Sequence, residues 1–600
     1  MYHLMAPPRR WTTADRLPND RLRRFPDVSP LVIQLLANRG VTEDDEVRAF
    51  LDGAAGTTHD PNLLKGIAEA IARIRKAIEH GELIAVHGDF DADGVTATAL
   101  LTEVLRALGA QVLPVIPKRE EGYGLNLSTF GTLANQGVSL VVTVDCGISS
   151  AREIVAAREL GLDVVVTDHH RVTSDLPMAA TAIVNPRQPG CEYPFKSLAG
   201  VGVAFKLAQA LLGAFEDVSG RLASGHPAAE IEQSVLDLVA LGTVADVVPL
   251  LGENRVLASR GLVELNRTSR PGLRELIRVA GLQPDRLDSW AISYTIGPRL
   301  NAAGRLGDAR ISFDLLTGSA GEAPALARKL EDINRERQII TEEMLEDARR
   351  KIAGQAESKL LFVASEDYPH GILGLVAGRL TDEFYRPAFV LKIDSDEARA
   401  SVRSIAEFDV AAALADCRDL LTRYGGHARA AGFTVPLANL DELRERLFGL
   451  AESQLANVDL EPTLRVDAEL DLRKVKWRVH EDLQRIGPFG YDNPTPLFLS
   501  RGLRVIHSRV VGQHAPGHLR LTVSDGINRW PAIGFGYGAS AASLPEIIDL
   551  VYQIEPDTWT GGQALQLRIR GLQPSEQSDR QVTFQVSAPP AALPARGEVE

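Results

Sequence analysis

Short apolar runs alternate with amphipathic stretches from residue 83 of the chain onward. LIAVHG at 83–88 has the continuous apolar pattern of a buried strand, and VTATALLTEVLRALG at 95–109 has the spacing of a helix that would follow it. Further apolar runs at 111–116, 140–145 and 163–168 are expected to be strands. Apolar strands that alternate with helices are typical of a parallel sheet covered on both faces. The pattern therefore predicts an α/β domain built on a parallel sheet.

The pattern changes in character after this domain. Residues 323–353 place apolar positions at helical spacing among many charges, which predicts one long, largely exposed helix between two domains. A second α/β segment extends from about 359 to 455. Residues 462–573 are rich in β-forming residues, arginines and aromatics, with turns at GPFG, SDG and TGG, so a small closed barrel is expected there.

Composition narrows the class of protein. At 600 residues the chain is too long for one core, so several domains are expected. Its three cysteines, Cys146, Cys191 and Cys417, form no Cys-x-x-Cys pair. This argues against a disulfide framework or a zinc–thiolate site and favours the reducing cytoplasm. We see no secretion signal at the N-terminus and no apolar run long enough to span a bilayer.

The net charge of −14 argues against a protein that coats nucleic acid nonspecifically. The charge is unevenly distributed, because residues 501–530 carry five arginines against one acid, Asp525. These arginines are Arg501, Arg504, Arg509, Arg520 and Arg529. A local basic groove is therefore compatible with the acidic total.

The motif HGDFDADG follows the first predicted strand and places His87, Asp89, Asp91 and Asp93 within seven residues. Carboxylates packed this closely repel one another unless cations lie among them. On an extended strand end, Asp91 and Asp93 would point the same way and face one site. An EF-hand loop is excluded because its twelfth position, counted from Asp89, is Leu100 rather than Glu. Taken alone, the motif is equally compatible with a solvated acidic turn.

Three more acidic or histidine clusters favour a metal site. Asp145 ends a predicted strand, Asp168-His169-His170 ends another, and Asp246 lies in an apolar stretch where an unpaired carboxylate would be costly. Four such clusters at the ends of parallel strands are hard to explain without a cation. Mixed carboxylate and imidazole ligands suit Mn²⁺ or Mg²⁺ better than structural zinc, which favours thiolates.

The chain resembles the DHH phosphoesterase superfamily, and within it the bacterial single-stranded-DNA exonucleases. The strings HGDFDADG, VDCG, TDHH and GTVADVVPL look like the four metal-binding motifs of the superfamily. Further strings match in the same order along the chain: PKREEGYGLN, IGPRLNAAGR, HGILGLVAGRL, SVRS, GGHARAAGF and IGPFGYDNPTPLF. One departure is Asp492-Asn493-Pro494, where the family usually has Gly-Asn-Pro.

The resemblance implies two divalent ions, Mn²⁺ or Mg²⁺, that promote direct attack of water on a phosphodiester. His87, Asp91 and Asp145 would hold one ion, and Asp93, Asp145, His169 and Asp246 the other, with Asp145 as the bridge. The remaining residues implied to be catalytic are Asp89, Asp168, His170, Arg299 and Arg305. Of these, Asp89 and Asp168 would orient the ligands. For His170 two roles stay open, contact with the scissile phosphate and contact with an ion. The residues implied to bind substrate are Arg119, Tyr123, Asn301, Ser401, Arg403, Gly425, Gly426 and His427.

The fold class implied is α/β: a parallel-sheet DHH domain, a long connecting helix, a second α/β domain of the DHHA1 type and a C-terminal OB-fold barrel. The arginines and aromatics of that barrel suit binding of single-stranded nucleic acid. The expected divisions are an N-terminal segment (1–60), the DHH domain (61–318), the connecting helix (319–355), the DHHA1 domain (356–455), the OB fold (460–575) and a disordered tail (576–600).

The resemblance further implies 5′→3′ degradation of single-stranded DNA in repair and recombination. It also implies a cytoplasmic monomer with single-stranded-DNA-binding protein and a repair helicase as partners. Two alternatives stay open: a phosphodiesterase for short oligonucleotides or cyclic dinucleotides, and an inactive single-strand-binding scaffold. The small-substrate relatives generally lack the long helix and the barrel, and scaffolds lose metal ligands that are all present here.

Overall fold

The computed structural model describes residues 10–53, 56, 58–119, 124–172, 175–355, 357–512, 517–557 and 561–576. Nearly all of the tail predicted to be disordered, and the candidate substrate residue Tyr123, lie outside these described residues. Within them, no helix is both long and apolar enough to cross a membrane.

A five-stranded parallel sheet forms the core of the first domain, as predicted. Its strands are β2 (Leu83–His87), β3 (Gln111–Val115), β4 (Val138–Val144), β5 (Asp163–Thr167) and β6 (Ala182–Val184), in the order β3-β2-β4-β5-β6. Successive side chains of a strand point to opposite faces. Val142 and Val144 of β4 therefore belong to one hydrophobic core, whereas Val141 belongs to another.

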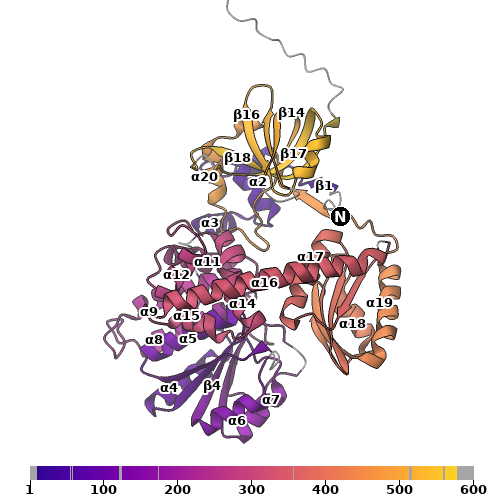
Figure 1. The fold of residues 1–600 in the computed structure, drawn as a ribbon. Coiled ribbons are helices and arrows are strands. Elements are labelled where there is room, and N and C mark those ends of the chain that lie inside the picture. The colour runs from indigo at the N-terminus through magenta and orange to yellow at the C-terminus, as the bar shows by residue number, and fades with distance from the viewer. Residues whose placement is uncertain are drawn as a thin grey trace, which may run out of the picture.

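Helices cover both faces of this sheet (Figure 1). One core is shared with α4 (Ile67–Glu79), α5 (Ala92–Ala107) and α8 (Gly200–Phe215). The other is shared with α6 (Leu127–Asn135) and α7 (Ala151–Glu159). The first core extends into a layer made of α9 (Ala228–Ser234), α10 (Leu236–Ala245), α11 (Gly252–Leu265), α12 (Pro271–Val279), α13 (Ser289–Ala291), the π-helix η4 (Ile292–Ile296), α14 (Gly297–Leu306) and α15 (Arg310–Thr317).

The long helix α16 (Ala323–Ile352) runs from the first domain to the second (Figure 1). Leu330 packs into the core of the first domain, and Met344 and Leu345 pack into a core of the second. The prediction that this helix is largely exposed is therefore wrong, because it carries a buried face in each half. A helix packed at both ends fixes the spacing of the two domains more firmly than an exposed spacer would.

The second domain contains a mixed five-stranded sheet in the order β10-β11-β9-β8-β7. Only β7 and β8 are parallel; the other pairs are antiparallel. The strands are β7 (Leu361–Ser365), β8 (Ala388–Ile393), β9 (Glu397–Arg403), β10 (Arg423–His427) and β11 (Ala430–Pro436). The helices are α17 (Leu373–Phe384), α18 (Val410–Asp416) and α19 (Leu440–Gln454).

The C-terminal barrel closes because β14 pairs with both β15 and β17, while β18 pairs with β16 and β17. Its strands are β13 (Ala468–Glu469), β14 (Phe498–Val511), β15 (His518–Ser524), β16 (Arg529–Gly534), β17 (Ile547–Pro556) and β18 (Leu565–Pro574). The helix α20 (Trp477–Gln484) precedes it. The predicted closed barrel is therefore confirmed.

The N-terminal segment folds with the barrel rather than with the first sheet. Strand β1 (Arg10–Thr13) pairs with β12 (Thr463–Val466), and α1 (Asn19–Leu22) follows it. Helices α2 (Pro30–Asn38) and α3 (Asp44–Asp52) share one hydrophobic core with the barrel strands. The beginning and the end of the described chain therefore form one structural unit.

The loop that joins the barrel to the first domain contains the departure from the Gly-Asn-Pro pattern. Asp492 has φ 58°, a left-handed conformation that favours glycine and that aspartate tolerates better than most residues. The loop is held by a hydrogen bond from the Leu250 backbone N–H to the Tyr491 carbonyl at 2.9 Å. This loop thus contains a left-handed backbone position that is occupied by aspartate instead of glycine.

Candidate active site

The predicted clusters converge at one edge of the parallel sheet. His87 is the last residue of β2, Asp145 directly follows β4, and Asp168 directly follows β5. Because β2, β4 and β5 are adjacent and parallel, their carboxyl ends meet. Asp246 reaches the same place from the C-terminal end of α10.

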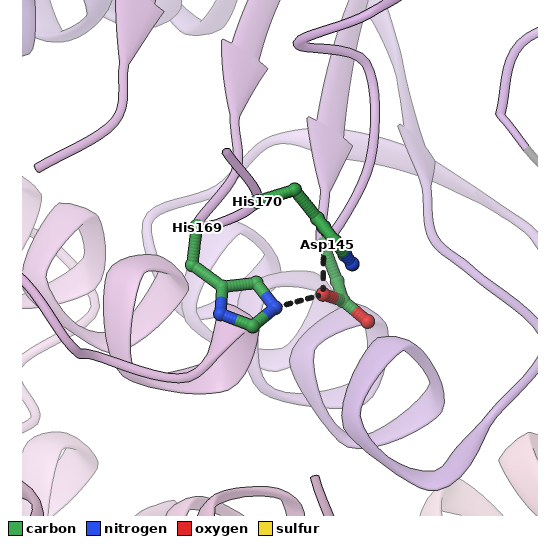
Figure 2. Close-up of side chains that lie close together, drawn as sticks. All are labelled: Asp145, His169 and His170. Carbon is green, nitrogen blue, oxygen red and sulfur yellow. Dashed lines mark ion pairs between the residues drawn. The ribbon is translucent and has the colours of Figure 1, made fainter. Parts of the chain in front are cut away.

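Three overlapping groups of ligand atoms lie there, with the atoms of each group within 4.8 Å of one another. They are Asp89, Asp91 and Asp145; Asp93, His169 and Asp246; and Asp145, His169 and His170. Figure 2 shows the imidazole of His169 directed at the Asp145 carboxylate, with Nε2 3.1 Å from Oδ1. Nε2 of His169 is 3.7 Å from Oδ2 of Asp246. Asp145 belongs to two of the groups and so lies between the other ligands.

The local structure of HGDFDADG differs from the predicted extended strand end. Asp91 is the N-cap of α5, and its Oδ1 accepts hydrogen bonds from the backbone N–H groups of Asp93 and Gly94. Asp93 lies in the first helical turn, where its carboxylate accepts the backbone N–H groups of Gly200 and Val201 at the start of α8. The prediction that Asp91 and Asp93 point the same way from a strand is wrong. Helix geometry sends them to different ligand groups.

The residues present fit a cation. Among the described side chains, Asp89 Oδ1, Asp145 Oδ1, His87 Nε2 and both ring nitrogens of His169 are buried without a hydrogen-bond partner. Buried polar atoms of this kind are rare unless they bind an ion or a water molecule. Mixed carboxylate and imidazole ligands suit Mn²⁺ or Mg²⁺. His87 belongs to none of the three groups, although its Nε2 is among these unpartnered atoms.

The titration behaviour of the cluster follows from burial. Burial, and after it the charge of Asp91, raises the pKa of Asp89 and of Asp93 to about 7. Burial and the neighbouring acids raise the pKa of Asp145 and Asp246 well above the usual range. Burial lowers the pKa of His169 to about 3. The imidazole is therefore neutral, as a metal ligand must be, and the crowded carboxylates need a cation to be charged together.

Asp168 holds the two histidines in place. Its Oδ1 accepts hydrogen bonds from the backbone N–H groups of His169 and His170 and lies 2.8 Å from the Nδ1 of His170. Its Oδ2 accepts the backbone N–H of Ile148. Burial acts against the charged forms of both Asp168 and His170. The hydrogen bond between their side chains nevertheless raises the pKa of His170 and lowers that of Asp168. Asp168 is thus placed to orient the two histidines and does not belong to a group of candidate metal ligands.

Two glycines that sequence reasoning missed make room for the carboxylates. A Cβ at Gly200 would lie 2.4 Å from Oδ1 of Asp145, and one at Gly242 would lie 2.7 Å from Oδ1 of Asp93. Both glycines therefore allow a helix backbone to approach the ligands closely. Gly242 was visible in the sequence as part of GTVADVVPL, but no pattern distinguished it from an ordinary helix glycine.

A cavity of about 660 Å³ opens beside the cluster, between the first and second domains. Asp89, Asp91 and Asp246 line one side, and Ser401 and Arg403 line the other. Two predicted arginines also line the cavity. Arg119 stacks its guanidinium 4.0 Å from the centre of the Phe90 ring, and Arg305 donates to the Gly371 carbonyl across the domain boundary. The cavity thus has carboxylates on one wall and cations on the other.

The other predicted substrate or catalytic residues lie in different places. Asn301 lines the cavity and accepts the backbone N–H of Ala92 at 2.8 Å, so it also supports the start of α5. Arg299 does not line the cavity, because its guanidinium binds Glu331 of α16 at 2.6 Å. Gly425, Gly426 and His427 lie on the exposed strand β10, next to the lining residues Arg423 and Tyr424.

A parallel sheet with this cluster at its strand ends, followed by a second α/β domain, is the arrangement expected of a DHH phosphoesterase. Residues 83–243 match the DHH family N-terminal domain, 357–453 the DHHA1 domain and 466–571 the RecJ OB domain. The single-stranded-DNA-specific exonuclease RecJ of Bacillus subtilis is 37% identical over 583 residues, covering 96% of this chain and 72% of that protein. The Escherichia coli protein of the same name is 34% identical, covering 91% and 96%.

Solved structures agree with these matches. A crystal structure of RecJ from Thermus thermophilus in complex with Mn²⁺ aligns with a TM-score of 0.78 at 31% identity, covering 94% of this chain and 80% of that one. A complex of the same protein with Mg²⁺ aligns with a TM-score of 0.73. The chain belongs to the RecJ exonuclease family. The predicted combination of DHH, DHHA1 and OB domains is confirmed.

Proposed function

We propose that this chain is a metal-dependent exonuclease that hydrolyses single-stranded DNA from its 5′ end. One observation carries the proposal: an Asp/His cluster with unpartnered ligand atoms faces a cavity whose opposite wall contributes Ser401 and Arg403. Carboxylates that bind cations and arginines that bind phosphate are the two components of phosphodiester hydrolysis. The relatives that match over most of their length are named single-stranded-DNA-specific exonucleases.

The metal ligands in this proposal are those that the family resemblance implies. Asp91 and Asp145, with His87, would hold one ion, and Asp93, Asp145, His169 and Asp246 the other. Asp89, for which the resemblance implies an orienting role, has a carboxylate oxygen within 4.8 Å of ligand atoms of Asp91 and Asp145, so we assign it to the first ion as well. Two divalent ions supply a deprotonated water as nucleophile and neutralise charge on the attacked phosphate.

The other residues position the strand. Arg119 and Arg305 reach the cavity between the cluster and the second domain, where guanidinium groups suit phosphate oxygens. Arg403 is half-buried and packs against α17, since a Cβ at Gly374 would lie only 3.3 Å from its Nη2. This packing holds the guanidinium beside Ser401, which also lines the cavity. We assign these four residues to the phosphates at the 5′ end of the strand.

Polarity is tested with single strands labelled at one end and digested with Mn²⁺. A 5′ label should be released first as a mononucleotide, while a 3′ label should stay on progressively shorter strands. Release of the 3′ label first would overturn the assigned direction. If a dinucleotide were hydrolysed while long strands were not, the protein would be a phosphodiesterase for short oligonucleotides.

Replacing Arg403 by alanine is expected to leave metal binding intact and to lower kcat/KM on single-stranded DNA about 10- to 150-fold. A hydrogen bond to a charged group is typically worth about 1.5–3 kcal/mol, which corresponds to that range. Mn²⁺ binding by calorimetry and hydrolysis rates would be measured on the same preparation. Arg335→Ala, which removes an exposed arginine from α16, serves as the matched control. Loss of bound metal in Arg403→Ala would contradict the division between cluster and phosphate clamp.

Roles beyond the active site are also part of the proposal. The resemblance favours a cytoplasmic monomer that acts in DNA repair and recombination with single-stranded-DNA-binding protein and a repair helicase. Light scattering coupled to gel filtration would test the oligomeric state, and a dimer at working concentration would contradict it.

A further inference from the structure

Two large aromatic side chains stack on each other at the surface of the first domain. Trp290 is 50% exposed and Tyr294 is 69% exposed. Their ring centroids are 5.5 Å apart with an interplanar angle of 28°. Exposed aromatic rings offer flat faces on which a further ring can stack. We call this pair the aromatic step.

The backbone that carries the aromatic step is held by a helix cap and by buried side chains. Trp290 belongs to α13, whose N-cap Asp288 accepts the backbone N–H of Ala291 at 2.9 Å. Tyr294 belongs to the π-helix η4, and π-helical turns are frequent at functional sites. Ile292 and Ile296 of the same turn are fully buried. The exposed rings therefore project from a rigid base and are not a disordered patch.

The aromatic step is connected through the start of α14 to the helix that ends at a candidate metal ligand. The residue that follows η4 is Gly297, where a Cβ would be 3.5 Å from the Cβ of Ala245. Ala245 is the last residue of α10 and is followed by Asp246, one of the candidate metal ligands. Tyr294 is three residues before Gly297, so the step begins about one helical turn from this contact.

The barrel reaches the aromatic step from the other side. Ser289, next to Trp290, donates its hydroxyl to the Phe489 carbonyl in the loop before the barrel at 2.6 Å. This hydrogen bond ties the base of the step to the loop that leads into the barrel.

The barrel itself carries a cation and further rings that lie beside one another. The guanidinium of Arg568 lies 5.2 Å from the centre of the Phe535 ring, which is 52% exposed. His518 contacts the same ring edge-on at 5.0 Å between centroids. Rings that can stack on bases, interleaved with cations that can pair with phosphates, are the pattern of single-strand binding.

We propose that the aromatic step is a base-binding subsite on which one or two nucleobases of the single strand stack between the metal cluster and the barrel. The occupant is the sugar–base portion of the substrate strand. The inference rests on the proposed single-strand exonuclease function and deepens it. It assigns to Trp290 and Tyr294 the stacking contact with the bases, whereas the residues assigned above bind the metal ions and the phosphates.

Binding of oligonucleotides with single abasic positions tests the subsite. The probe is a series of 5′-phosphorylated single strands, each with phosphorothioate linkages against hydrolysis and one abasic position, bound to the Mn²⁺-loaded full chain. Stacking on an aromatic side chain corresponds to a change in Kd of about 5- to 150-fold per base. The wild-type protein should lose affinity to this extent only when the missing base falls in one short window of positions.

Variants of Trp290 and Tyr294 test whether these two side chains bind the base at the sensitive positions. Trp290→Ala/Tyr294→Ala should bind the intact strand about as weakly as the wild type binds the abasic strand, and the abasic position should then make no further difference. Trp290→Phe/Tyr294→Phe keeps both rings and should restore the sensitivity. All variants should bind Mn²⁺ like the wild type, because neither residue belongs to a ligand group.

Two results would overturn the subsite. One is an abasic window that persists unchanged in the double alanine variant, which would place the stacked base elsewhere. The other is wild-type affinity of that variant for the intact strand. Failure of the underlying function would look different, since the wild type itself would then not hydrolyse the dinucleotide or the strand with Mn²⁺. Melting curves of the variants would confirm that the exposed rings were removed without unfolding.

Discussion

Replacing Asp145 by alanine is expected to abolish hydrolysis and to leave fewer than two Mn²⁺ ions bound per chain. Asp145 belongs to two of the three ligand groups, and its Oδ1 is buried without a hydrogen-bond partner. Its removal would take a ligand from both groups and leave the remaining carboxylates facing one another. Metal content by elemental analysis and product release from labelled single strands measure the two effects.

Comparison with Asp168→Asn separates a ligand from a residue that orients one. Asp168 contacts the histidines through three hydrogen bonds and belongs to none of the ligand groups. Residues that orient metal ligands typically cost about 10- to 100-fold in affinity or activity when changed. We therefore expect Asp168→Asn to keep measurable activity. Asp217→Ala, at an exposed turn, controls for loss of an acid. Near-wild-type hydrolysis by Asp145→Ala with two ions bound would disprove its bridging position.

The convergence of the cluster could be predicted from the sequence because topology determines it. Asp145 and Asp168 each follow an apolar run, and parallel strands place such positions at one edge of the sheet. The same reasoning failed at HGDFDADG, where Asp91 was treated as part of a strand. Aspartate is also a preferred helix N-cap, and that preference prevails here. The motif contained both signals, and only the structure shows where the strand ends.

Contacts between distant segments could not be predicted. Arg299 was expected at the phosphate from its motif, yet Glu331 of the following long helix holds its guanidinium. The pairing of β1 with β12 joins segments about 450 residues apart, and no periodicity indicates such a pairing. Trp290 and Tyr294 have the i, i+4 spacing of an ordinary buried helix face. Their exposure depends on which side of η4 the rest of the domain covers.

The helix that supports the cluster is itself held by a fully buried ion pair. Nζ of Lys206 on α8 lies 2.7 Å from Oε1 of Glu253 on α11, and both side chains are at most 1% exposed. Lys206 also donates to the His59 carbonyl, and Glu253 accepts the Tyr193 hydroxyl at 2.6 Å. Burial lowers the pKa of Lys206, while Glu253 opposes the change. Helix α8 also supplies the N–H groups that hold Asp93, so this ion pair helps to fix a helix that positions a candidate metal ligand.

Replacing Lys206 by methionine is expected to destabilise the first domain by about 3–5 kcal/mol, because it leaves the Glu253 carboxylate buried without its cation. The thermal transition of that domain should therefore fall markedly, as measured by calorimetry of the full chain. Lys206→Met/Glu253→Gln removes both charges while the amide can still accept the Tyr193 hydroxyl, so it should recover much of the loss. Arg310→Met, which breaks a half-exposed ion pair with Asp314, should leave the transition almost unchanged. If the single and double variants at Lys206 melted alike, an unpaired charge would not be the cause, and lost packing of the lysine side chain would account for the effect.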